Sequence, residues 1–461
     1  MNRQFLVYIL FSMLTWQQVY AQDENHITGL SDLIQMSLNH SPGLHADSAA
    51  ILIKDAQLAA AKYNWLPSLK LNYQTDIGTN NNLPGGYFSY GIVPSNSRVR
   101  DRGTSSTILT DLGIAFFDWE IYNFGGFEAQ QKVASSDLQV QQLHFEQSKY
   151  DLQYKIATAY LQLTRLSNLL SIQYQHILRN AEIKRTIRSL AISGIKAGVD
   201  TSIAEAELSK SRLTYLELNN QFKQVQQQLS YISGIAPENI YPDSLLEDRI
   251  INNAALFFAA PIDSVNHPSI NLYNAIRQNS VDKETLIRKS YLPKVSFEAA
   301  AWGKGSSVSA KDQFRSLGNG LGFERGNYLV GFGISYNIVD LKKSKLQLRT
   351  QRANTDYAQK KLEEQQALLS TAISEADIEL STAESRLKEI PQQLNAANAA
   401  YRQKLSLYKS GLIDIIELNA ALSILYRAET DYTNAKFLFC RAVFQKAIAA
   451  NQLPHLINSL K

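Results

Sequence analysis

The sequence predicts a mixed α and β protein made of two tandem structural repeats, each with two amphipathic strands and one long helical hairpin. Three observations lead to this prediction. Helical periodicity persists far longer than in a globular domain, four segments alternate strictly with a period of two, and a pair of motifs recurs at one fixed offset. The net charge of +4 on 461 residues is small and dispersed, so it gives no indication of a nucleic-acid partner.

The repeats are recognised from two proline motifs. Asn-His-Ser-Pro, ending at Pro42, is matched by Asn-His-Pro, ending at Pro268, and Trp-Leu-Pro, ending at Pro67, by Tyr-Leu-Pro, ending at Pro293. Both offsets equal 226 residues, since 268 − 42 and 293 − 67 give the same number. We therefore divide the chain into a first repeat (22–235), an inter-repeat linker (236–262), a second repeat (263–450) and a C-terminal tail (451–461).

The first 21 residues are predicted to be a signal peptide. Arg3 precedes an apolar stretch from Phe5 to Trp16, and Ala21 is a small residue suited to cleavage before Gln22. A short buried helix is the alternative. The single cysteine, Cys440, excludes an intramolecular disulfide framework, and no cysteine follows the expected cleavage site to carry a lipid anchor. We expect an exported chain.

Each repeat is predicted to open with a helix (31–63 and 269–289) and to continue, after its strands, into a hairpin (125–232 and 342–449). A helix of about 65 residues has a long apolar stripe that only an equally extended partner can cover. The chain supplies that partner by folding back. We place the tips at Gly198 and Asp200 in the first hairpin and at Gly411 and Leu412 in the second, with the glycines at positive φ and Asp200 as an N-cap.

The strands are expected at 65–78, 107–122, 291–302 and 327–340, where apolar and polar residues alternate. The polar face includes Lys70, Asn72, Gln74, Ser296 and Glu298. A half-buried soluble sheet would show the same alternation. Export, long Gly/Asn/Ser-rich loops and strands of about 10 residues favour membrane-spanning strands instead.

Four strands cannot close a barrel, and an open sheet edge in lipid leaves backbone groups unpaired at several kcal/mol each. Three copies would supply about twelve strands, a barrel size within the known range. The five polar residues would then face a water-filled lumen, and the helical hairpins would continue the barrel as a coiled-coil tunnel on the periplasmic side.

The Leu-Pro motifs before the strands, the glycine-centred tips and the duplication together resemble the TolC family of outer-membrane efflux channels, over nearly the whole mature chain. The resemblance implies a homotrimer in the outer membrane of a Gram-negative bacterium, surrounded by outer-membrane lipid. It also implies docking onto a periplasmic adaptor (membrane fusion) protein and an inner-membrane transporter of the RND or ABC type. The chain would be a passive exit duct. The alternative is a periplasmic coiled-coil adaptor or scaffold protein.

The resemblance further implies a periplasmic gate. In the family's best-known member, two aspartates lie six and nine residues after the second tip glycine; here the sixth residue is Glu417, a match in charge, whereas the ninth is Ala420 and departs from the pattern. Asp414 lies three residues before Glu417, on the same helical face, and is the substitute we predict. Tyr408 matches a family tyrosine that holds the closed state. Helix capping and solvated faces are the alternative roles for these acids.

Nothing in the sequence indicates catalysis or a cofactor. The seven histidines show no metal-ligand spacing, and no nucleophile motif is present. We expect no enzyme activity, no cofactor and no metal centre. The exported substrate is not identifiable from the residues.

Overall fold

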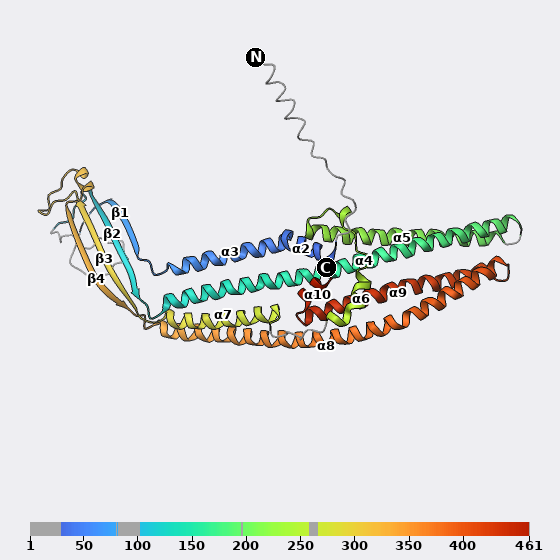
Figure 1. Cartoon of the computed structure of the whole chain (residues 1–461). Helices are drawn as coiled ribbons and strands as arrows, with labels where there is room; N and C mark the ends of the chain where they lie inside the picture. Colours follow the sequence, from blue (N-terminus) through green and yellow to red (C-terminus); the bar gives the residue numbers. More distant parts are fainter. Residues whose placement is uncertain (1–28, 80, 82–101, 195–196, 258–265, 461) are drawn as a thin grey trace, which may run out of the picture. The chain divides into compact units, whose positions relative to one another are not determined.

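The computed structural model describes residues 29–79, 81, 102–194, 197–257 and 266–460 (Figure 1). The predicted signal peptide and most of the first inter-strand loop lie outside these residues. The chain forms two compact units. The first combines the segment up to Ala49 with Leu143–Leu272 and Leu362–Lys461, and the second combines Ala50–Gln142 with Tyr273–Lys361.

The second unit contains one four-stranded antiparallel sheet, with two strands from each repeat (Figure 1). Its strands are β1 (Ser68–Gly78), β2 (Ile108–Tyr122), β3 (Lys294–Ser306) and β4 (Arg325–Ser335), in the order β1-β2-β3-β4. Among the described residues, β1 and β4 each have one edge that pairs with no other strand. The sheet is therefore open on both sides.

The pairing register places the predicted polar residues on one face of this sheet and a set of large apolar residues on the other. Residues directly opposite each other point to the same side. Asp118 pairs with both Ser68 and Glu298, so the even-numbered residues of β1, β2 and β3 share a face. That face carries all five predicted polar residues, Lys70, Asn72, Gln74, Ser296 and Glu298. Their lumen-facing role stays a prediction.

The opposite face is rich in large apolar side chains that are exposed in the single chain. Its exposed members are Leu69, Leu71, Tyr73, Ile77, Tyr328, Val330, Phe332 and Ile334, and it also carries the half-buried Phe117 and Phe297. The Phe297 ring lies 5.2 Å from that of Phe332 and 6.0 Å from that of Phe117, centroid to centroid. A face this apolar is suited to contact with lipid or protein rather than water.

The last strand ends earlier than predicted. Alternation continues in the sequence to Ile338, but β4 stops at Ser335 and α8 begins at Asp340. Asn337 explains the boundary, because its side-chain amide donates to Asp340 and its oxygen accepts from the backbone N–H of Val339. A local side-chain turn thus replaces the strand ladder.

Each repeat contributes one hairpin of long helices. These are α4 (Gly126–Ile192) with α5 (Gly198–Ser233), and α8 (Asp340–Lys409) with α9 (Ile415–Ala449). The single helix predicted for 31–63 is instead two helices, α2 (Leu30–His40) and α3 (Pro42–Lys62). The break falls at Ser41 because Pro42 disfavours a helical conformation in the residue before it. The second repeat opens with α7 (Pro268–Ser290).

The segments predicted as linker and tail hold short helices. The linker contains η2 (Pro237–Asn239) and α6 (Leu246–Phe257), the tail contains α10 (Leu453–Ser459), and η3 (Leu317–Leu321) lies between β3 and β4. The inter-repeat linker is therefore partly helical.

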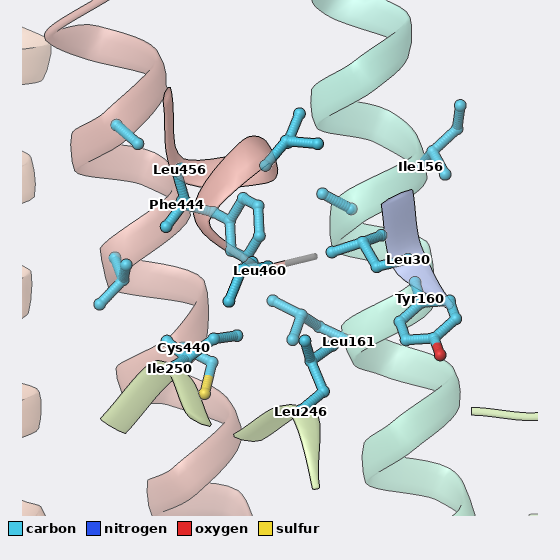
Figure 2. Close-up of a cluster of buried hydrophobic side chains, with 14 of the residues drawn as sticks. Leu30, Ile156, Tyr160, Leu161, Leu246, Ile250, Cys440, Phe444, Leu456 and Leu460 are labelled. Atoms are coloured by element: carbon cyan, nitrogen blue, oxygen red, sulfur yellow. The ribbon is translucent and has the colours of Figure 1, made fainter. Parts of the chain in front are cut away.

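The main core of the first unit lies where α6 and α10 meet the long helices (Figure 2). Leu246 and Ile250 from α6, with Leu456 from α10, pack together with Leu161 of α4 and Phe444 of α9. Each fully buried side chain of this kind contributes roughly 1.5–3 kcal/mol. These short segments therefore join the two hairpins at the level of the linker.

Candidate functional site

A second apolar cluster packs the two hairpins together toward their tips, where the gate and docking residues were predicted. It includes Ile187 of α4, Ala204 of α5, Tyr408 of α8, and Leu418 and Leu422 of α9. All four long helices contribute to this cluster, so the residues of the candidate site lie next to a well-packed apolar core.

The tip of the second hairpin is the predicted glycine reversal. Gly411 has a φ of 78°. Its N–H donates to the carbonyl of Tyr408 at 3.0 Å, and the N–H of Leu412 donates to the carbonyl of Leu407 at 3.0 Å. These two bonds form a Schellman motif, which satisfies the last carbonyls of α8. The prediction of a positive φ at Gly411 is confirmed.

The first tip differs from the prediction. The left-handed residue is Gly194, with a φ of 74°, whereas Gly198 is the first residue of α5. Ala197 occupies the N-cap without a side-chain bond, so the prediction of Asp200 as N-cap was wrong. Asp200 lies in the first turn, and its N–H donates to the carbonyl of Ala197 at 3.1 Å. The helix ends earlier because the first of the two glycines already permits the reversal.

Asp414 and Glu417 lie together at the start of α9, both exposed. Asp414 is the N-cap in an extended conformation, and its Oδ1 accepts from the backbone N–H of Glu417 at 2.9 Å. The Glu417 carboxylate pairs with the ammonium group of Lys404 on α8. Asp414 therefore has a structural capping role of the kind that stabilises a helix by about 1 kcal/mol.

Tyr408 is fully buried, with 0% of its surface exposed. Burial raises the pKa of its phenol, and the negative charge of Asp200 raises it further. The structure thus brings Tyr408, from the second hairpin, within electrostatic range of Asp200, from the first. The sequence placed these two residues in separate tips.

A charged link between the hairpins was not predicted from the sequence. Arg179 of α4 donates from both terminal nitrogens to the two carboxylate oxygens of Glu429 on α9, at 2.8 and 2.7 Å. Three residues earlier on each helix, the rings of His176 and Tyr426 stack at 4.5 Å with an interplanar angle of 30°. No local sequence pattern predicts this pairing, because Arg179 and Glu429 are 250 positions apart in the chain.

The surroundings of this ion pair shift the pKa values of two basic side chains on α4, Arg179 and His176. The hydrogen bonds to Glu429 raise the pKa of Arg179. Burial lowers the pKa of His176 to about 4, and the positive charge of Arg179 adds to that effect. His176 is therefore neutral at physiological pH. Beside the pair, Arg179, Ile183, Tyr401 and Tyr408 line a groove of about 270 Å³.

The described part of the chain contains no group of three or more His, Cys, Asp and Glu side chains that could hold a metal ion. Within the same residues, none of the helices is both long and apolar enough to cross a membrane.

Several solved outer-membrane channels share this fold. OprN superposes with a TM-score of 0.70 at 18% identity, covering 91% of this chain and 89% of its own. CusC gives 0.73 at 11% identity, covering 94% and 95%. CmeC of Campylobacter jejuni gives 0.70 at 14% identity, covering 95% and 89%. No curated protein sequence gives a significant match.

The chain thus has the fold of an outer-membrane channel subunit. Residues 33–234 and 265–442 match the profile of the family described as "Outer membrane efflux protein", so the chain belongs to that family. It is an efflux channel protein of the outer membrane, and the alternative of a periplasmic adaptor is not supported.

Proposed function

We propose that three copies of this chain close one twelve-stranded barrel and form a passive exit duct that carries out no chemistry of its own. The observation that carries the proposal is the open four-stranded sheet, with β1 and β4 edges that pair with no other described strand and with many large apolar side chains on one face. Joining β4 of one copy to β1 of the next satisfies both edges, which lipid requires.

Two adjacent residues of β1 allow a test of which face of the sheet contacts lipid. Leu71 and Asn72 are neighbours on β1 and point to opposite faces. A lysine on the lipid face of a barrel costs about 2–4 kcal/mol at mid-membrane depth. Leu71→Lys is therefore expected to abolish the boiling-sensitive trimer in outer-membrane fractions, while Asn72→Lys leaves it intact. A wild-type protein recovered as a water-soluble periplasmic monomer would refute the proposal.

We further propose that the hairpin tips form the periplasmic gate and the docking surface. Asp414 and Glu417 are exposed at the start of α9, and Glu417 is paired with Lys404. In a ring of three copies, these carboxylates would attract cations, and Asp414 would contribute the larger share of the net negative charge because Lys404 offsets that of Glu417. At the tips, Leu412 and Ile416 present apolar side chains to solvent. Such a patch is suited to a protein partner, and we assign it to a periplasmic adaptor.

The adaptor would connect the duct to an inner-membrane transporter of the RND or ABC type. Cross-linking from a photoreactive side chain at Leu412, followed by identification of the captured protein, tests this assignment. The same group at Ile378, an exposed apolar residue of α8 far from the tip in sequence, is the matched control. Equal capture of the same partner from both positions would remove the tips as the docking surface.

A further inference from the structure

The connection between β3 and β4 folds back onto the sheet and is fastened there. The backbone N–H of Ser307 donates to the carbonyl of Leu109 at 2.8 Å, and the N–H of Leu109 donates to the Ser307 hydroxyl at 2.9 Å. Gly320 lies so close that a Cβ there would be 2.2 Å from the Leu109 carbonyl oxygen. This segment is therefore held against β2 by specific contacts and by a required glycine.

Asp111 is buried beneath this connection. It lies on β2 between Thr75 of β1 and Gly305 of β3, and only 3% of its surface is exposed. Neither of its carboxylate oxygens has a hydrogen-bond partner among the described residues. A buried carboxylate in that condition costs several kcal/mol unless a positive group compensates it.

The nearby basic side chains do not supply that charge. Lys304 of β3 and Arg325 of β4 occupy directly opposite register positions, and their side chains lie on the opposite face of the sheet from Asp111. Arg315, in the connection itself, donates to Glu324 at 2.8 Å. Among the described residues, Asp111 therefore has no hydrogen-bonding basic partner, and a cation from solution can supply the compensating charge.

A second oxygen atom converges on the same space. A Cβ built at Gly305 would lie 1.9 Å from Oδ1 of Asp111 and 2.1 Å from the carbonyl oxygen of Gly322. The two oxygen atoms therefore lie no more than 4.0 Å apart, the sum of 1.9 and 2.1 Å. Both are acceptors, and neither can donate a hydrogen bond to the other while the carboxylate is ionised.

We propose that Asp111 and the Gly322 carbonyl bind a divalent cation, and that this cation fastens the β3–β4 connection to the sheet. An all-oxygen site with one carboxylate and one carbonyl suits Ca²⁺, which accepts irregular geometry and completes its shell with water. Because only one ligand is charged, we expect a dissociation constant on the order of 0.1–1 mM, as in extracellular modules. The proposal rests on these contacts and not on the trimer or the gate.

Trypsin provides a local readout, because Lys311 and Arg315 are exposed in the same connection. In the purified full-length protein in detergent, 5 mM Ca²⁺ is expected to slow cleavage at these two sites at least fivefold relative to EDTA. Asp111→Asn keeps the side-chain shape but should lose this protection. Asp76→Asn removes an exposed acid from the end of β1 and should keep it. Mg²⁺ in place of Ca²⁺ is expected to protect less.

Terbium luminescence on the wild type provides a second measurement that needs no folded variant. Bound Tb³⁺ should be displaced by Ca²⁺ with one saturable transition. The proposal fails if Ca²⁺ does not change wild-type cleavage, or if Asp111→Asn responds to Ca²⁺ as the wild type does. It also fails if a proton compensates Asp111; lowering the pH without calcium would then protect the connection, and Ca²⁺ would add nothing.

Discussion

Arg179 and Glu429 join the two hairpins through a bidentate ion pair, with nitrogen–oxygen distances of 2.8 and 2.7 Å. The pair lies beside the apolar cluster that contains Tyr408, and both side chains are partly buried. Partial burial limits screening by salt, and the planar guanidinium matches both carboxylate oxygens. Separation of the hairpins at this level would therefore require loss of two charge-assisted hydrogen bonds.

Arg179→Gln is expected to destabilise the contact between α4 and α9 by about 1–3 kcal/mol, because it leaves a partly buried carboxylate without its partner. Thermal unfolding should begin at lower temperature, and single-channel recordings should show more time in open states. The exchange Arg179→Glu with Glu429→Arg should restore much of the loss. If Arg179→Gln changes neither the thermal unfolding nor the conductance, the pair does not hold the hairpins together.

His176 is expected to make the hairpin contact sensitive to acid. The pKa of His176 is about 4 in the folded chain, compared with 6.5 for an unperturbed histidine. Between about pH 4 and 6.5, the unfolded state therefore binds up to one proton more than the folded state. Stability conferred by the neutral ring is complete above about pH 6.5 and is lost as the pH falls toward 4.

His176→Gln should flatten the dependence of the melting temperature on pH in that window. His144→Gln, at an exposed position of the same helix, is the matched histidine control. Identical pH profiles for wild type and His176→Gln would contradict the assignment.

Glu247 of α6 is expected to have the opposite effect on the pH dependence of stability from His176. It is only 1% exposed, and its Oε2 accepts from Asn168 at 3.1 Å while Oε1 has no partner among the described residues. Burial raises its pKa from 4.5 to about 7; the charge of Lys436 partly offsets this shift, and Asp248 adds to it. The folded state therefore binds the extra proton, and stability falls as the pH rises from 4.5 to 7.

Glu247→Gln removes this ionisation and should raise the melting temperature at pH 8 much more than at pH 5. The shift in pKa corresponds to at most about 3 kcal/mol. Glu238→Gln, at an exposed position in η2, is the matched control and should have no effect at either pH. If Glu247→Gln changed the melting temperature equally at pH 5 and pH 8, the substitution would act only through packing.

The two tip glycines are expected to respond differently to alanine. No heavy atom lies within 4 Å of a Cβ built on either Gly411 or Gly198, so neither substitution creates a clash. Only Gly411 has a positive φ, at 78°. Gly411→Ala should cost about 1–2 kcal/mol for the left-handed conformation, while Gly198→Ala, in the first turn of α5, should be neutral or stabilising. Equal melting temperatures for the two variants would contradict the assigned turn.

Neutralising the proposed gate acids calls for isosteric changes, because Asp414 also caps α9. Asn is as good an N-cap as Asp, so Asp414→Asn together with Glu417→Gln removes the charge with little loss of helix stability. Divalent-cation block of single-channel current should weaken at least tenfold. Unchanged block in a variant with wild-type melting temperature would exclude both acids from the gate.

The sequence by itself determined the repeats, the four amphipathic strands, the two hairpins and the reversal at Gly411. These features depend on periodicity, proline and glycine, whose effects are local and can be read along the chain. Even the polar face of the sheet followed from alternation, because the antiparallel register preserves it across strands.

Only the tertiary structure decided which distant residues meet. It paired Arg179 with Glu429, brought Asp200 near Tyr408, and buried Asp111 opposite the Gly322 carbonyl. It also moved the first reversal to Gly194, because two glycines four residues apart are equally permissive in sequence and packing selects between them. Such choices depend on contacts between separate segments, which no local pattern specifies.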